Sequence, residues 1–379
     1  MTPLVHIRHA YFWLFSFVGI FATFASPYFK SIGLSGTEIG VIGAISPIMM
    51  VVMPSVFGAV ADKRGNTTGT FRFVMFAAMF TMLAFPFAAS FWPVFVMIAA
   101  MSFFRTSSGA LLDSLTLTLS EKNGGDFGAV RLWGSIGFVT TSLIVGVIAD
   151  LTSLTSIAWA MVVALVMGAF VSLWLPTVAR ERSDNVLKDL AEVLQNRDFM
   201  LFLLSVFANR FAATAPLIFY PIMLKEAHYS NVFVALFWVM GVGAEIIYFR
   251  FAPILAARFG ASRIAVVATL GIVVHFGLFL VVSAPAWILV IQTLHALTFG
   301  AFYYTGVTYV ARVVPRRMRA GGQALFAAAG FGVAGGLSSL CGGAIFDRYR
   351  GEGVLWFAVA AGVLAVAATI PVAERLTRV

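Results

Sequence analysis

The sequence predicts an all-α membrane protein with twelve transmembrane helices, arranged as two bundles of six. Three observations support this fold class. Hydrophobic residues occupy 61% of the 379 positions and charged residues only 11%, whereas about 25% of residues are charged in an average soluble domain. Apolar runs long enough to cross a bilayer follow one another along the whole chain. Two distant segments also resemble each other, which indicates two halves built on one plan.

The apolar runs favour helices over the strands of a barrel. In hydrocarbon every backbone polar group must be bonded within the protein, which leaves only these two solutions. The run Val266–Val282 lacks the two-residue alternation of a barrel strand. Each helix takes about 20 residues, and the mean hydropathy of +0.96 leaves no room for a sizeable soluble domain. We expect spans near residues 9–31, 38–61, 71–90, 93–119, 128–150, 154–175, 199–224, 231–257, 262–283, 286–311, 320–346 and 352–372.

These spans divide the chain into three regions. We expect an N-terminal six-helix bundle at 1–175, a cytoplasmic linker at 176–198 and a C-terminal six-helix bundle at 199–379. Apolar residues recur at helical spacing between Val186 and Leu194, among charged residues. This pattern predicts a short amphipathic helix on the membrane surface that ties the two bundles together.

Basic residues lie in alternate loops, which predicts the orientation in the membrane. One side carries only Lys30, Lys225, Arg348 and Arg350. The other side carries Arg8, Lys63, Arg64, Lys122, Arg180, Arg182, Lys188, Arg197, Arg258, Arg263, Arg312, Arg316, Arg317, Arg319, Arg375 and Arg378. Because cytoplasmic loops are rich in lysine and arginine, we expect a multi-pass protein of a bacterial-type inner membrane with both termini cytoplasmic and an uncleaved first helix. The net charge of +9 lies in these loops, so we expect no nucleic-acid partner.

Two further features have structural interpretations. The aromatic run Tyr11-Phe12-Trp13 is typical of a belt at the membrane–water interface. The single cysteine, Cys341, cannot form a disulfide within the chain, and we expect it to be a packing residue.

The internal repeat relates two segments at an offset of 195 residues. Thirty-five residues separate Lys30 from Gly65, and thirty-five separate Lys225 from Gly260. In each segment a lysine precedes a long apolar stretch and a short loop that ends in glycine. Paired halves of this kind are typical of membrane transporters.

The loop between spans two and three carries a recognisable motif. It reads Gly58-x-x-x-Asp62-Lys63-Arg64-Gly65. This motif resembles the loop signature of the major facilitator superfamily, and the resemblance extends over the whole chain. It implies a conformational gate, in which the aspartate caps a neighbouring helix and pairs with a basic residue when the protein faces outward; an ordinary charged loop is the alternative. A carboxylate is stabilised at the positive end of a helix. The second copy has Ala257 in place of the aspartate, so we expect an asymmetric gate.

The start of span five is similar to proton symporters of the lactose permease and 3-phenylpropionate permease group. The similarity lies in the segment Val130–Ser135. It implies that Arg131 binds the substrate, that Asp113 late in span four pairs with it, and that Phe138 stacks on the substrate.

Spans eight and ten resemble the 3-phenylpropionate permease more than the sugar transporters, in the segments Met240–Glu245 and Ile291–His295. Sugar symporters carry an arginine where His275 stands, a carboxylate where Thr298 stands, and a lysine near Phe331. The proton-coupling network of the sugar permeases is therefore not reproduced here.

Several charged side chains lie inside predicted spans. A charge at mid-bilayer costs on the order of 3 kcal/mol on insertion scales, so each needs a partner or a function. With Arg131 included, four cations face two carboxylates, which favours an anionic substrate because arginine offers a planar fork that matches a carboxylate. Interhelical ion pairs are the alternative role for these charges. Arg250 can also extend its side chain to the membrane interface. The five charges that stand out are Arg105, Asp113, Arg210, Glu245 and Arg250.

The C-terminal half contains the candidate proton carriers. We expect Glu245 to be the only buried carboxylate of this half, and His275 and His295 titrate near neutral pH when unperturbed. A hydrogen bond to a neighbouring helix is the alternative role for either histidine. Candidate hydrogen-bond partners for a substrate nearby are Asn209, Gln292 and Tyr303.

We expect a secondary transporter that couples protons to the symport of a small organic anion, resembling an aromatic acid, by alternating access. The expected partners are a small-molecule substrate, protons and the lipid bilayer. We expect a monomer without cofactor or metal. The alternatives are proton-coupled uptake of a sugar or nucleoside, and an exporter of drugs or metabolites by antiport. A membrane enzyme is disfavoured because the sequence shows no His-x-x-x-x-Asp cluster and no phosphate-binding glycine loop. A sensor would bind the ligand without any flux.

Overall fold

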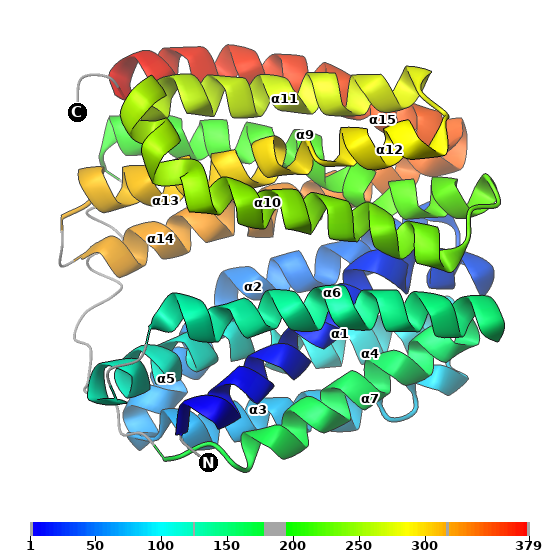
Figure 1. Ribbon diagram of the computed structural model, residues 1–379, viewed down its shortest axis with the longest axis vertical. Helices are drawn as coiled ribbons and strands as arrows, with labels where there is room; N and C mark the ends of the chain where they lie inside the picture. The colour runs from blue at the N-terminus through cyan, green and yellow to red at the C-terminus, as the bar shows by residue number, and fades with distance from the viewer. Residues whose placement is uncertain (1–2, 124–125, 178–194, 316–317, 377–379) are drawn as a thin grey trace. The chain divides into compact units, whose positions relative to one another are not determined.

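The computed structural model describes residues 3–123, 126–177, 195–315 and 318–376, and within these ranges the chain forms helices and no strands (Figure 1). The all-α prediction is confirmed. The first half contains α1 Pro3–Ser31, α2 Gly36–Arg64, α3 Thr67–Met82, η1 Phe85–Phe87, α4 Phe91–Arg105, α5 Ser108–Asn123, α6 Phe127–Leu151 and α7 Thr155–Ser172. The second half contains α9 Arg197–Glu226, α10 Asn231–Phe259, α11 Ala261–Val281, α12 Pro285–Gln292, η2 Ala296–Ala301, α13 Phe302–Val313, α14 Arg319–Ala327, η4 Ala328–Ala334 and α15 Gly335–Leu376.

Eleven helical segments in the described part of the chain are long and apolar enough to cross a membrane. Ten of them coincide with the first ten predicted spans, and the eleventh, Gly321–Ala373, contains both of the last two. A straight helix of its 53 residues would be about 80 Å long, whereas the hydrocarbon core measures about 30 Å. α15 consists of two helices that meet at Arg350, where φ is 57°. This break lies between the last two predicted spans.

Two of the predicted spans are interrupted helices. The span predicted at 93–119 is divided into α4 and α5 at Thr106–Ser107. The span predicted at 286–311 is divided into α12, η2 and α13. Both η2 and η4 are π-helices. This geometry is rare in proteins, and where it occurs it often lies at a functional site.

The helix positions confirm the internal repeat. The helices α9 to α12 begin 194 or 195 residues after α1 to α4, in the same order. The loops after α2 and α10 both contain a glycine with positive φ, 59° at Gly65 and 79° at Gly260, although ψ differs between them, 23° and 146°. Only glycine adopts positive φ freely, which explains the glycine that ends both copies.

The chain forms two compact units: unit 1 is Met1–Ser183 with Leu224–Ala235, and unit 2 is Asp184–Met223 with Leu236–Val379. The predicted linker helix lies at residues 178–194, outside the described residues. The predicted boundaries of the two bundles stay predictions.

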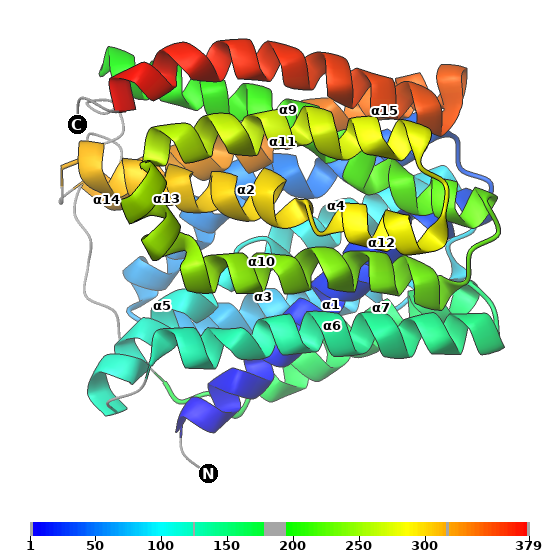
Figure 2. The ribbon, with the colours of Figure 1, turned by 45° about the horizontal axis from the view of Figure 1, so that its top comes forward.

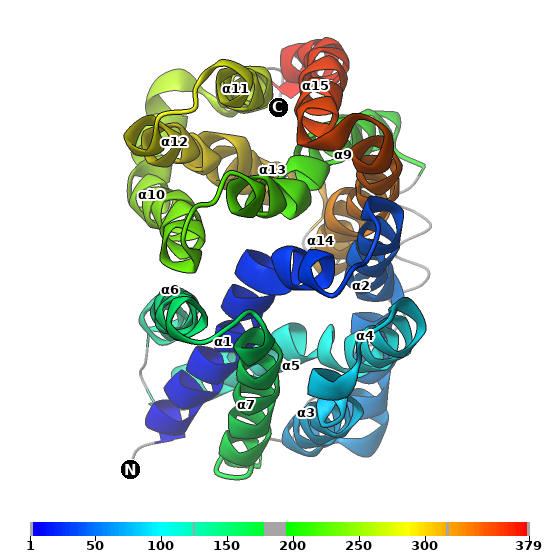
Figure 3. The same ribbon diagram turned by 90° about the vertical axis from the view of Figure 1, so that its right-hand side faces the viewer.

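In unit 1, α1 packs along α6 and α7 (Figures 2 and 3). Small residues allow the backbones of α1 and α6 to touch. A Cβ added at Gly137 would collide with the carbonyl of Phe12, and one at Gly19 would lie 2.7 Å from the carbonyl oxygen of Phe138. This close packing fixes α6, which carries Arg131, against α1.

In unit 2, α11 packs along α15, and the two helices run side by side (Figures 1 and 3). A buried apolar cluster from α9, α11, α13 and α14 fills the interior of this unit.

Candidate functional site

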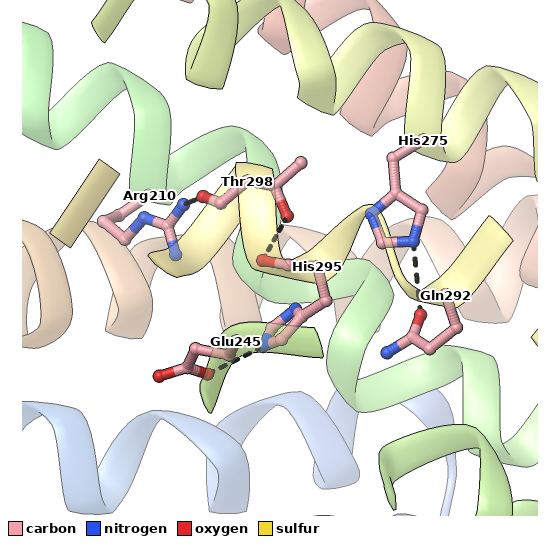
Figure 4. Close-up of polar contacts among 6 residues, drawn as sticks. All are labelled: Arg210, Glu245, His275, Gln292, His295 and Thr298. Carbon is pink, nitrogen blue, oxygen red and sulfur yellow. Dashed lines mark hydrogen bonds and ion pairs between the residues drawn. The ribbon is translucent and has the colours of Figure 1, made fainter. Parts of the chain in front are cut away.

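Unit 2 holds a group of buried polar side chains at membrane depth, which we call the polar cluster. Its members come from α9, α10, α11 and the interrupted helix α12–η2, and Figure 4 shows contacts among all of them except Asn209. The polar cluster consists of Asn209, Arg210, Glu245, His275, Gln292, His295 and the backbone of Thr298.

Arg210 is the buried cation of the polar cluster, with 3% of its surface exposed. Its Nε and Nη2 donate to the Oδ1 atom of Asn209 at 3.0 and 2.6 Å, and Nη2 also donates to the carbonyl of Thr298. The guanidinium lies 4.4 Å from the ring centre of Phe302, which adds a cation–π attraction. Neutral oxygens and aromatic rings therefore hold this charge in place.

The π-helix η2 supplies one of these contacts. An added residue in a π-turn displaces backbone carbonyls from their usual positions, and the carbonyl of Thr298 in η2 accepts from Arg210. Small residues also bring η2 close to α10, because a Cβ at Gly300 would lie 3.2 Å from Cγ of Glu245. Neither feature is visible in the hydropathy pattern.

Glu245 and His295 form the acid–base pair of the polar cluster. Oε2 of Glu245 lies 3.9 Å from Nε2 of His295, which is an ion pair when the histidine is protonated. The imidazole stacks on Phe299 at 5.3 Å between ring centres. Its Nδ1 atom has no hydrogen-bond partner within the described part of the chain.

His275 and Gln292 form a second pair. Nε2 of His275 lies 3.2 Å from Oε1 of Gln292, and both residues are fully buried. Nδ1 of His275 and Nε2 of Gln292 have no hydrogen-bond partner among the residues described. Leaving buried polar atoms unpaired costs about 1–3 kcal/mol each, so these atoms are suited to water or a ligand.

In unit 1, the predicted substrate residues Asp113 and Arg131 both contact Tyr11. The Tyr11 hydroxyl donates to Oδ1 of Asp113 at 2.5 Å and accepts from Thr116 at 3.1 Å. The Arg131 guanidinium lies 3.9 Å from the ring centre of Phe15 and 5.4 Å from that of Tyr11.

The prediction that Tyr11 belongs to an interfacial belt is wrong, because its side chain is fully buried and bonded to Asp113. The aromatic run alone could not reveal this. A tyrosine that enters a helix bundle keeps its hydroxyl satisfied only if a polar partner lies at the same depth, and Asp113 is that partner.

The remaining candidate residues each have different neighbours. Arg105 lies 4.9 Å from the ring centre of Phe17, six residues beyond Tyr11 on α1. Phe138 is buried where α6 touches α1. Tyr303 is 40% exposed and stacks on Phe299. Arg250 is exposed, outside the polar cluster.

The predicted gate residues end α2. Gly58 lies on the last turns of the helix, Asp62 is half-buried, and Lys63 and Arg64 are exposed. Gly65 closes the helix in the left-handed conformation, and its N–H donates to the carbonyl of Asp62. The gating role of these residues stays a prediction.

The chain is similar to known transporters along its whole length. A maltose permease from Geobacillus stearothermophilus is 26% identical, covering 96% of this chain and 93% of the permease. A probable 3-phenylpropionic acid transporter from Escherichia coli (strain K12) is 28% identical, covering 91% of this chain and 92% of that protein. The crystal structure of the nucleoside transporter NupG superposes with a TM-score of 0.85 at 17% identity, covering 100% of this chain and 99% of that one.

The family assignment agrees with the fold and with the buried charges. The family model described as "MFS_1 like family" matches residues 4–357. The chain therefore belongs to the MFS_1 like family and is a multi-pass membrane transporter of the major facilitator superfamily.

Proposed function

We propose that this transporter couples proton entry to the uptake of a small organic anion, with aromatic acids as the substrate class. The observation that carries the proposal is the buried Arg210. In the described part of the chain, its Nε and Nη2 are bonded to neutral oxygens and its Nη1 makes no hydrogen bond. A buried guanidinium with donors left over is suited to a carboxylate.

Charge balance in the polar cluster supports coupling to protons. Arg210 carries one positive charge, and ionised Glu245 carries one negative charge. A bound carboxylate adds a second negative charge, which a proton on Glu245 or His295 cancels. Because each net charge in the membrane costs on the order of 3 kcal/mol, the anion and the proton each favour the binding of the other.

Unit 1 contains a second candidate basic group of its own. Arg131 is partly exposed and lies against the rings of Phe15 and Tyr11. The flat face of the Arg131 guanidinium lies against these rings, so the N–H groups around its edge can donate to a carboxylate. The proposal assigns Arg131 to substrate binding, with Asp113 and Tyr11 as its supporting pair and Phe138 and Arg105 as further contacts.

Names of relatives support an organic solute as substrate. The probable 3-phenylpropionic acid transporter favours an aromatic acid. The maltose permease and NupG favour the second candidate, a neutral sugar or nucleoside, for which the Gln292 amide offers hydrogen bonds. Because the fold sets no direction of transport, an exporter is the remaining candidate.

The proposal extends to the setting of the protein. The transporter is a monomer of a bacterial inner membrane with both termini cytoplasmic, and it catalyses no chemical reaction. The segment Gly58–Gly65 gates its cytoplasmic side, with Asp62 as the switching carboxylate. This orientation rests on the basic residues of alternate loops.

A substrate panel in proteoliposomes tests the proposal. Labelled aromatic acids, sugars and nucleosides are offered with and without an imposed pH gradient, alkaline inside. Protein-free liposomes correct for passive entry of undissociated acid. We expect protein-dependent accumulation of an aromatic acid, driven by the gradient. Accumulation of sugars or nucleosides alone would support the second candidate, and accumulation that ignores the gradient would overturn proton coupling.

A further inference from the structure

A small pocket lies in unit 2 beside the polar cluster, and none of the functions assigned above uses it. It has a volume of about 40 Å³ and lies among α9, α11, α13 and the C-terminal part of α15. Its polar side chains are hydroxyls, with one arginine at the rim. These side chains are Ser205, Thr269, Thr305, Thr308, Tyr309, Thr369 and Arg312.

The pocket runs from the surface to buried hydroxyls. Arg312 is exposed, whereas Ser205, Thr269 and Thr369 are 8%, 2% and 2% exposed. A water molecule needs roughly 10–15 Å³ measured in this way, so about three fit.

Hydrogen bonds through Asn209 join Thr269, on the wall of the pocket, to Arg210. Ser205 and Thr369 lie 2.8 Å apart between their hydroxyl oxygens, and Thr269 lies 3.5 Å from Thr369. Nδ2 of Asn209 donates to Oγ1 of Thr269 at 2.9 Å. Oδ1 of the same amide accepts both bonds from Arg210.

The hydroxyl protons fix the direction of these hydrogen bonds. Thr269 donates to the carbonyl of Ala265 at 3.0 Å, and Thr369 donates to that of Ala365 at 2.8 Å. Oγ1 of Thr269 can therefore only accept from Asn209. An amide whose NH₂ group is held by an acceptor must turn its oxygen the other way, toward Arg210.

The pocket presents lone pairs rather than donors along its inner wall. Thr305 and Thr308 also donate to carbonyls of their own helix. Water molecules there would donate to the remaining lone pairs of the threonines and keep the inner wall satisfied. At position 269 a threonine hydroxyl can accept the hydrogen bond from Asn209, whereas valine has the same shape but no lone pair to accept it.

We infer that Thr269, backed by water in this pocket, is a positioning residue that orients the Asn209 amide and through it the Arg210 guanidinium. The inference deepens the proposed function, since it explains why Nη1 is the part of Arg210 left for an anion. Thr269 acts only through Asn209.

Arginine side-chain NMR tests the positioning directly and needs no substrate. The Nε–H signal of Arg210 in detergent-solubilised, ¹⁵N-arginine-labelled protein is assigned by its loss in Arg210→Lys. We expect its exchange with water to be at least ~10-fold faster in Thr269→Val than in the wild type, and restored in Thr269→Ser. Thr308→Val, which loses a hydroxyl from the same pocket without touching Asn209, should exchange like the wild type.

A binding measurement separates this inference from the proposed function. The probes are 3-phenylpropionate and its uncharged amide, 3-phenylpropionamide. We expect Thr269→Val to weaken the carboxylate about tenfold and to leave the amide unchanged.

Unchanged Arg210 exchange in Thr269→Val would overturn the inference and leave the proposed function standing. Faster exchange in Thr269→Val would keep Thr269 as the positioning residue whatever the binding result. If carboxylate binding is then unchanged in Thr269→Val, or the wild type binds no carboxylate, Arg210 is not part of an aromatic-acid site.

Discussion

Single residues show how this fold carries charge inside a membrane. Arg210 is held by the Asn209 amide, the Thr298 carbonyl and the face of Phe302, with Glu245 nearby as a longer-range partner. The sequence predicted the depth of this arginine, because charge stands out in an apolar run. Beyond the adjacent Asn209 it could not predict the partners, since Thr298 and Phe302 come from a segment far along the chain.

The histidine assignments show the same limit. Sequence patterns named Glu245, His275 and His295 together, and the structure brings Glu245 and His295 to 3.9 Å. It pairs His275 with Gln292 instead. Thr269 was not singled out, because a threonine in an apolar helix gives no signal until its neighbours are known.

Replacing Arg131 with alanine should remove most of the affinity for an organic anion. Charged hydrogen bonds contribute about 1.5–3 kcal/mol, or roughly ten- to a hundredfold in affinity. Arg131→Lys should retain part of the affinity, because lysine keeps the charge but loses the planar fork. Equilibrium binding of labelled 3-phenylpropionate measures the effect.

Arg250→Ala is the matched control for this change. Arg250 is exposed and outside the polar cluster, so its loss should leave affinity unchanged. Wild-type affinity in Arg131→Ala would remove this arginine from the substrate site.

Helices are the scale at which the sequence was most informative. Hydropathy placed the spans, and the repeat offset is matched by helix starts 194 or 195 residues apart. The breaks inside the predicted spans 93–119 and 286–311 were missed, because an interrupted helix keeps the same apolar composition. The π-helices η2 and η4 were missed for the same reason.

Gly137→Ala should destabilise the packing of α6 on α1. The added Cβ would meet the backbone of Phe12, which cannot move aside as a flexible side chain can. Overpacking of this kind costs about 1–3 kcal/mol. Thermal unfolding in detergent measures the loss.

Gly109→Ala serves as the control, because an added Cβ there has no neighbour within 4 Å. It should unfold at or slightly above the wild-type temperature, since alanine favours helix over glycine. Equal unfolding temperatures for Gly137→Ala and the wild type would show that α1 and α6 are not closely packed in the membrane protein.

The whole molecule is a duplicated plan whose halves have diverged. Gly65 and Gly260 both have positive φ, whereas Ala257 stands at the position in the second half that is equivalent to Asp62. At the same offset, Glu245 stands where the first half has Met50. The shared features support the fold, and the differences are where we place gating and proton coupling.

Proton movement with and without Glu245 tests the central claim most directly. Proteoliposomes loaded with a pH-sensitive dye receive 3-phenylpropionate, and protein-free liposomes correct for passive entry of the acid. We predict that the wild type acidifies the lumen as substrate enters. Glu245→Gln should abolish this proton entry and leave substrate exchange between the two sides intact, and the exposed Glu352→Gln should behave like the wild type. Substrate uptake without proton entry in the wild type, or undiminished proton entry in Glu245→Gln, would contradict the account.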